Sequence, residues 1–304
     1  MIRRARRVAF VGLIGTAALG CGGARSSGGA APPGPEPRGD GGRPGVAPGR
    51  AVTYRPTRGH YVFQRRDSVT IDVPNAGVQT QTLGRTAFLG VEVVDSAGGY
   101  RLRITLDSVR ADSGVQIPAA ALDSLRGTRW SARMSPAGEL SEFRVQSVAG
   151  GPETPVDSAQ VTALGAQLAS EFARIFPVLP QGGATVGARW TDTTETPTRS
   201  QGLELVERSA VEYVAPEAEQ REGVAAIRVE SRASFTRQGA GTQFGQQVEM
   251  SGGGVRTAVN YIALDGRLLE STGTDSATLT VTVPAVGQSV PVHQQGTFVV
   301  RRIR

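Results

Sequence analysis

The chain has 304 residues, with 40 Gly, 18 Pro and 5% aromatic residues, which is typical of a turn-rich protein and not of a membrane-spanning helical bundle. The basic residues number 33, all of them Arg, and the formal net charge is +6. A single Cys and two His exclude a disulfide framework, a Cys-rich zinc site and a cluster of three imidazoles.

The excess positive charge lies in the first 50 residues. They hold eight Arg against Glu36 and Asp40, whereas residues 51–304 hold 25 Arg and 25 Asp or Glu. A domain without net charge has no bulk attraction for phosphate, and no Gly-Lys phosphate-binding motif is present. The sequence therefore argues against nucleic acid as a partner.

Residues 1–20 have the pattern of an export signal. Four Arg precede an uncharged, mainly apolar stretch at 8–20, which is too short to span about 30 Å of hydrocarbon. The sequence Ala18-Leu19-Gly20-Cys21 follows and resembles the lipobox of bacterial lipoproteins. This resemblance implies that Cys21 carries a lipid and anchors the protein to a membrane. An ordinary export signal with an incidental Cys is the alternative.

The residues after Cys21 predict a tether and suggest a location. Residues 22–50 contain 10 Gly and 6 Pro and are too polar to form a core, so we expect a disordered linker over 21–50. Gly22 and Gly23 stand where inner-membrane lipoproteins of this kind carry Asp. By that analogy, the outer membrane or periplasm is favoured over the inner membrane.

From residue 51 onwards, apolar and polar residues alternate with the period of half-buried antiparallel strands. Leu279, Val281 and Val283 alternate with Thr, so one face of the sheet is expected to be wet. The pattern recurs at 61–73, 100–106, 130–134, 140–145, 206–214, 224–235, 244–250, 255–264, 278–283 and 297–303. Gly-rich hairpin turns are predicted at 239–245 and 251–254.

Two segments have a helical pattern instead. In 157–175, apolar residues recur every three or four positions up to Pro177, which predicts an amphipathic helix with one apolar face. A shorter helix is predicted at 118–125, where Pro118 suits a first turn. We expect the longer helix to lie on the open face of the sheet and close its core.

An internal repeat divides the β region into a first unit (51–150), a helix and linker (151–186) and a second unit (187–304). Gly138-x-Leu-x-Glu matches Gly266-x-Leu-x-Glu, and Arg129-Trp130 and Arg189-Trp190 each precede a strand pattern. A duplication explains this, and a shared hairpin pattern is the alternative. Either way, Gly138 and Gly266 are expected at hairpin turns with positive φ.

The fold class indicated is mainly β: an antiparallel sheet or half-barrel, of two related β units, with the two helices named above. The sequence Phe176-Pro177-Val178-Leu179-Pro180, followed by Val186-Gly187-Ala188-Arg189-Trp190, resembles the "fPxLP…vGxxW" linker of a family of uncharacterised bacterial lipoproteins. More distantly, the layout is similar to the periplasmic lipoprotein carriers, whose half-barrels enclose an acyl chain. That second likeness is architectural only.

No catalytic motif stands out. His60 and His293 have no neighbouring sequence that would orient them, and the Glu residues at 204, 207, 212 and 230 fall on expected strands, where a solvated Glu is the default. We therefore predict no enzyme, no metal and no cofactor.

Two kinds of function remain open. The first is a binding module or carrier for a lipid or other apolar envelope ligand, because a sheet closed by an amphipathic helix can enclose a cavity. The second is a structural or assembly lipoprotein that presents its β surface to another envelope protein. The candidates for lining a cavity are Leu164, Leu168, Phe172, Trp130 and Trp190, although core packing is the plainer interpretation of both Trp residues.

Overall fold

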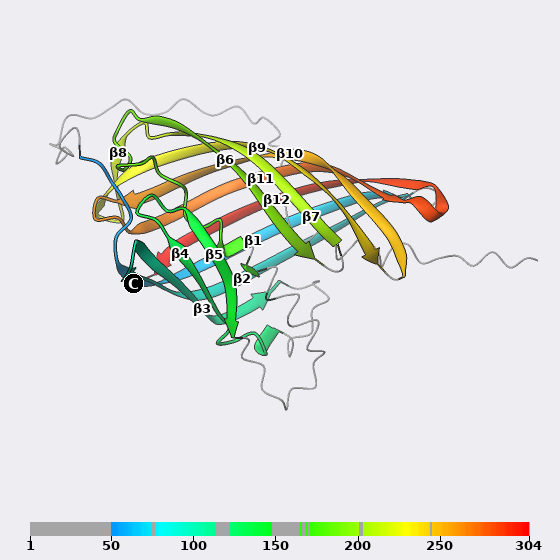
Figure 1. Ribbon diagram of the computed structural model, residues 1–304, viewed down its shortest axis with the longest axis horizontal. Helices are drawn as coiled ribbons and strands as arrows, with labels where there is room; N and C mark the ends of the chain where they lie inside the picture. The colour runs from blue at the N-terminus through cyan, green and yellow to red at the C-terminus, as the bar shows by residue number, and fades with distance from the viewer. Residues whose placement is uncertain are drawn as a thin grey trace, which may run out of the picture.

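The computed structural model describes residues 50–73, 77–112, 122–147, 165, 168–169, 171–200, 203–243 and 245–303. Twelve strands of this part form one antiparallel sheet (Figure 1). They are β1 (Thr57–Val73), β2 (Gly77–Ser96), β3 (Gly99–Ala111), β4 (Arg129–Met134), β5 (Leu140–Ser147), β6 (Arg189–Ser200), β7 (Leu203–Val214), β8 (Ala218–Arg221), β9 (Val224–Gln243), β10 (Gln246–Ala263), β11 (Leu268–Val283) and β12 (Gln288–Ile303).

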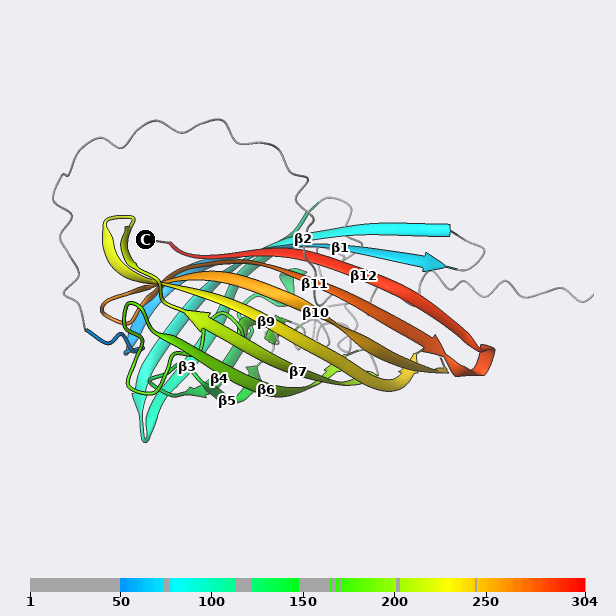
Figure 2. The same ribbon diagram turned by 90° about the horizontal axis from the view of Figure 1, so that it is seen from above.

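The strand order joins both predicted units in one sheet. It runs β5-β4-β3-β2-β1-β12-β11-β10-β9-β7-β6, with β8 paired to β9 beside this path. The first and last strands are neighbours at its centre, where His60 lies opposite Ile303 and Ile71 opposite Val292. The sheet is open, with β5 and β6 at its ends, and it is strongly curved (Figure 2). The mainly β, half-barrel prediction is confirmed, while the duplication stays a prediction.

The strand predictions are confirmed, but the observed strands are longer and β2 was missed as a strand. The first half of β2, with the sequence GVQTQTLGRT, has few apolar residues and a weak signal. Hairpin turns occur at Gly138 (φ 91°) and Gly266 (φ 88°), as predicted. Of the turn predicted at 239–245, Gly245 (φ 77°) does lie in the turn between β9 and β10, but residues 239–243 belong to β9, so that part of the prediction is wrong.

The turn predicted at 251–254 is wrong, because these residues lie inside β10. A Cβ on Gly254 would lie 1.9 Å from the Ser276 carbonyl oxygen and 2.8 Å from the Phe235 ring. Glycine is needed at this position because neighbouring strands and an aromatic ring approach the backbone closely in the curved sheet. A Ser followed by three Gly is locally typical of a turn. Here the close contacts with neighbouring strands place these residues in a strand instead.

Only fragments of the predicted helices fall within the described residues. Of 157–175, residues 165, 168, 169, 171 and 172 are helical and 173–174 form a turn; the others up to 170 lie outside the described residues. Of 118–125, residues 122–123 are helical and 118–121 lie outside. The export signal and nearly all of the tether also lie outside. Within the part that is described, no helix has the length and apolarity to cross a bilayer.

The concave face carries two buried apolar clusters. The first combines strand residues with residues from connecting segments, among them Leu125, Leu168, Phe172, Phe176 and Leu179. The second has thirteen members: Val69, Ile71, Leu203, Leu205, Phe235, Val248, Met250, Ala277, Leu279, Val281, Val283, Val290 and Val292. Every one of these thirteen lies on a strand. The connecting segments therefore complete only the first cluster, as far as the described residues go.

The opposite, convex face is polar. Thr278 and Thr280 are exposed, whereas Leu279 between them is buried. Hydroxyl groups pair across the strands on this face, as between Thr70 and Thr80 (3.0 Å). The prediction that one face of the sheet is wet is confirmed.

Candidate functional site

A short segment, residues 171–179, lies on the concave face between the two halves of the sheet, and we call it the strap. Phe172 is fully buried and packs edge-to-face against Phe63 and Trp130, with ring centroids 5.6 and 5.2 Å apart. Phe176 packs in the same way on Tyr54 at 5.6 Å. Such aromatic pairs contribute beyond the apolar area that they bury, so the strap is part of the first cluster.

The strap also forms polar contacts with both halves of the sheet. The Trp190 indole, at the start of β6, donates to the Val178 carbonyl oxygen at 2.8 Å. The Leu179 N–H donates to the Ala137 carbonyl oxygen, in the turn between β4 and β5, at 2.7 Å. Just before the strap, the Gly165 carbonyl oxygen accepts the Trp130 indole N–H of β4 at 3.3 Å. The strap region therefore connects β4 and the β4–β5 turn to β6.

Four of the five residues that the sequence offers as the lining of a cavity lie within the described part of the structure. Trp130, Leu168 and Phe172 are at most 1% exposed and belong to the first cluster. Trp190 is half-buried and stacks on Tyr213, with ring centroids 5.1 Å apart. Leu164 lies outside the described residues. Four of the five candidates thus belong to the first cluster or pack against it, and three of them have side chains fully covered by protein atoms.

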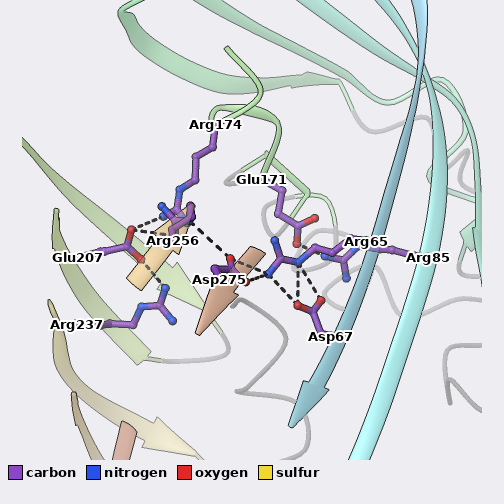
Figure 3. A network of polar contacts seen from close by, with 9 residues as sticks. All are labelled: Arg65, Asp67, Arg85, Glu171, Arg174, Glu207, Arg237, Arg256 and Asp275. Atoms are coloured by element: carbon purple, nitrogen blue, oxygen red, sulfur yellow. Dashed lines mark hydrogen bonds and ion pairs between the residues drawn. The ribbon is translucent and has the colours of Figure 1, made fainter. Parts of the chain in front are cut away.

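A belt of charged residues, all buried or half-buried except Arg174, crosses the concave face beside the strap (Figure 3). It consists of Arg65, Asp67, Arg85, Glu171, Arg174, Glu207, Arg237, Arg256 and Asp275. Arg65 lies 2.8 Å from Asp67 and 3.2 Å from Asp275. Glu207 lies 3.0 Å from Arg174 and 2.5 Å from Arg237. Two strap residues therefore belong to this belt: Glu171, which pairs with Arg85 of β2, and Arg174, which pairs with Glu207 of β7.

The belt separates the two apolar clusters along the strands. On β1, Phe63 belongs to the first cluster, Arg65 and Asp67 to the belt, and Val69 to the second cluster. These four positions share one face because side chains alternate along a strand. Phe235 of the second cluster has the Arg237 and Arg256 guanidinium groups over its ring, at 5.6 and 5.2 Å from the centroid. The belt is therefore in direct contact with the second cluster.

The arginines stabilise the charged form of Glu207. Burial by itself raises the pKa of this carboxyl, but Arg174, Arg256 and Arg237 outweigh that effect and lower the pKa to about 2. Burial likewise opposes the charge of Arg65, yet Asp275 and Asp67 raise its pKa well above the ordinary value. Both groups therefore remain ionised at neutral pH, and the belt is a set of ion pairs.

Sequence reasoning missed most of the belt. The sequence pattern groups Glu207 with three other Glu residues on strands, but only Glu207 lies in the belt. Of the others, Glu204 and Glu212 are exposed and Glu230 is half-buried. A local signal did exist for Arg65 and Asp67, because both occupy inward positions of the β1 alternation. Their partner Asp275 could not be found in this way, since it comes from a distant strand.

The two histidines lie away from the belt. The His60 Nδ1 is 3.2 Å from an Asp107 carboxylate oxygen, and both side chains are exposed. His293 pairs with the Thr278 hydroxyl on the convex face at 3.2 Å. Over the described ranges, no group of three His, Cys, Asp or Glu residues has a geometry suited to a metal ion.

An open pocket of about 540 Å³ lies over β6, β7 and β9. Its lining is Thr193, Thr194, Glu195, Arg208, Ser209, Ala210, Ser234, Phe235 and Thr236. The lining combines hydroxyl groups and the exposed Glu195–Arg208 ion pair (2.7 Å) with apolar surface. Phe235 belongs both to this lining and to the second cluster.

The comparisons with known proteins identify no family. No family model matches the chain, and no curated protein matches it. Among solved structures, an outer membrane protein of Vibrio cholerae, the loop L8 deletion mutant of OmpT, is 6% identical, with 82% of this chain and 99% of that chain covered and a TM-score of 0.15. A likeness this weak supports no functional argument, so the function must be argued from the chain itself.

Proposed function

We propose that this protein is an exported lipoprotein of the bacterial cell envelope, anchored through Cys21, that binds the apolar part of an envelope ligand on its concave face. The binding surface is the second apolar cluster. Residues 21–50 act as the tether between the anchor and the sheet, and the protein lies at the outer membrane or in the periplasm. No catalytic step is part of this function.

The observation that carries the proposal is the composition of the second cluster. Its thirteen apolar residues all lie on strands, and no described connecting segment adds a side chain to it. These thirteen side chains are at most 8% exposed, so protein atoms already cover them and a ligand would take the place of part of that cover. The strap packs into the first cluster, so the second is the part of the concave face that we assign to an acyl chain.

Lipid binding is tested on the protein purified from membranes and on a soluble Cys21→Ser form. Native mass spectrometry of the first is expected to reveal a co-purifying lipid, and the second is expected to bind a pyrene-labelled fatty acid. Leu279→Asn places an amide in the second cluster and should weaken that binding. Thr280→Asn, on the opposite face of the same strand, is the matched control. Absence of both a lipid and fatty-acid binding in the unsubstituted protein would refute the proposal.

The anchor has its own test. Cys21→Ser should release the protein from the membrane fraction or leave it unprocessed, because a single acylated Cys supplies the attachment. If the Cys21→Ser protein still fractionates with membranes to the same extent, lipidation at this residue is not what holds it there.

A second candidate function is that of an assembly lipoprotein, and one observation favours it. Strand β6 pairs with β7 without a register shift from Arg189 to Ser200, and it is the last strand of the open sheet. An unpaired strand edge can accept a strand from another protein. Photo-crosslinking from position 193 in intact cells would favour this function if it captured one defined envelope protein while the purified protein bound no lipid.

A further inference from the structure

The strap holds two oppositely charged residues that pair with opposite halves of the sheet. Glu171 pairs with Arg85 of β2, and Arg174, one helical turn later, pairs with Glu207 of β7. In the strand order, β2 lies on the β5 side of the central β1–β12 pair and β7 lies on the β6 side. These two ion pairs therefore connect the two halves across the concave face (Figure 3).

The backbone of the strap forms the same connection a second time. The Leu179 N–H donates to Ala137 beside β5, and the Val178 carbonyl oxygen accepts from Trp190 of β6. Strand pairing does not join β5 to β6, since they are the two ends of the sheet path. The separation of the two ends therefore depends on the strap, on residues 52–54, which bond to Pro136 and Ala184, and on the stiffness of the sheet.

We propose that the strap is a releasable brace that sets the aperture of the half-barrel. Its release lets β5 and β6 move apart. If the proposed function holds, release also governs the access of an apolar ligand to the second cluster; the brace itself does not depend on that function.

The belt supports release on the β7 side because Glu207 keeps ion-pair partners without the strap. When Arg174 leaves, Glu207 retains Arg237 at 2.5 Å and Arg256 at 3.7 Å. A buried charge left without a partner is strongly destabilising, and the two remaining arginines avoid that cost for Glu207. On the β2 side, Arg85 loses its ion pair with Glu171, so release is easier on the β7 side. Glu171 regains water on release, whereas Arg174 is already exposed.

The apolar contacts of the strap oppose complete detachment. Phe172, Ile175, Phe176 and Leu179 are all buried in the first cluster. Lifting the charged contacts is therefore expected to loosen the strap at the belt while its apolar residues stay in place. The brace then stays fixed at Val178 and Leu179 and is released at Glu171 and Arg174, so the two halves part at the belt.

The aperture can be measured directly without any ligand. Spin labels are attached at Gln146→Cys on β5 and Thr193→Cys on β6, both exposed positions, in the soluble Cys21→Ser protein. Their separation is then measured by pulsed electron paramagnetic resonance. The double variant Glu171→Gln with Arg174→Gln should lengthen and broaden the distance distribution. Glu195→Gln with Arg208→Gln, which removes an exposed ion pair between β6 and β7, is the matched control and should leave the distribution unchanged.

A second measurement checks that the brace variant is still folded. Amide exchange of residues 171–179 should become about tenfold faster in the brace variant, while the central strands β1 and β12 keep their protection. An unchanged distance distribution in a variant that retains this protection overturns the brace. Since no ligand is present, that result leaves the lipid-binding test above unaffected. A widened aperture combined with no fatty-acid binding refutes the proposed function and leaves the brace standing.

Discussion

Trp130 and Trp190, the two tryptophans of the chain, donate their indole N–H groups to the same connecting segment, at Gly165 (3.3 Å) and Val178 (2.8 Å). Trp130 comes from β4 and Trp190 from β6, so the two strands lie in different halves of the sheet. An indole N–H that is removed from water needs an acceptor. In both cases, the acceptor is a backbone carbonyl that no strand pairing uses.

Trp190→Phe tests one of these two contacts. The Phe side chain retains an aromatic ring that can stack on Tyr213, but it lacks the N–H that donates a hydrogen bond to the Val178 carbonyl oxygen. We therefore expect a loss of about 1 kcal/mol in the free energy of unfolding. Urea unfolding followed by far-UV circular dichroism measures it. Tyr213→Phe leaves the indole bond intact but removes the hydrogen bond between the Tyr213 hydroxyl and the Val178 backbone, so it measures that second contact separately. Equal stability of Trp190→Phe and the unsubstituted protein would show that this bond contributes nothing.

Glu207→Gln tests the belt. The substitution leaves Arg174, Arg237 and Arg256 around a neutral group, and breaking a buried ion pair in this way costs about 3 to 5 kcal/mol. Glu195→Gln removes the same charge from an exposed pair, where solvent screening leaves little effect. Chemical denaturation of both variants under one set of conditions gives the comparison. Similar losses in the two would contradict a structural role for the buried pairs.

The pH dependence of stability follows from Glu207. Its pKa in the folded protein is about 2, below the ordinary value of 4.5, so the folded state favours the ionised form. The stabilisation is therefore complete above about pH 4.5 and declines as the pH falls towards 2. Burial raises the pKa of Asp67, which has the opposite effect on stability.

The stability difference between the unsubstituted protein and Glu207→Gln isolates the Glu207 contribution, because Asp67 is present in both. We expect this difference to shrink steadily between pH 4.5 and 2 in denaturation series. A difference that stays constant over this range would mean that Glu207 titrates normally in the folded state.

Gly254→Ala tests the close approach of the strands in β10. The added methyl group would meet the Ser276 carbonyl oxygen and the Phe235 ring, and such overpacking costs about 1 to 3 kcal/mol. Gly90→Ala is the control, because a Cβ there finds only ordinary contacts at 3.8 Å or more. Thermal unfolding should show a lower midpoint for Gly254→Ala alone. Comparable midpoints would remove the steric reason for glycine in this strand.

Leu168 tests how tightly the first cluster is packed. Its side chain is 1% exposed, so Leu168→Ala should cost about 2 to 5 kcal/mol, towards the upper end of that range in a solid core. Leu168→Trp should overpack the same place and cost about 1 to 3 kcal/mol or more. A Trp variant that unfolds like the unsubstituted protein, together with a small cost for Ala, would instead indicate unfilled space beside Leu168.

The sequence alone predicted what depends on neighbours along the chain. The alternation of period two placed most strands and assigned Leu279, Val281 and Val283 to the buried face. Gly138 and Gly266 were recognised as hairpin turns because positive φ is a local requirement of such turns. Trp130 and Trp190 were placed at the starts of strands. The export signal and Cys21 also rest on local sequence, and they stay predictions.

The tertiary structure decided what depends on pairing between distant segments. Alternation indicates which side of a strand is buried but not which strand lies beside it. The junction of β1 with β12, the meeting of Arg65 with Asp275, and the use of Gly254 as a strand residue all follow from that pairing. The strap is the clearest case, because Glu171 and Arg174 are ordinary helix-surface charges in the sequence. Only the curvature of one continuous sheet places Arg85 and Glu207 where these two residues can reach both.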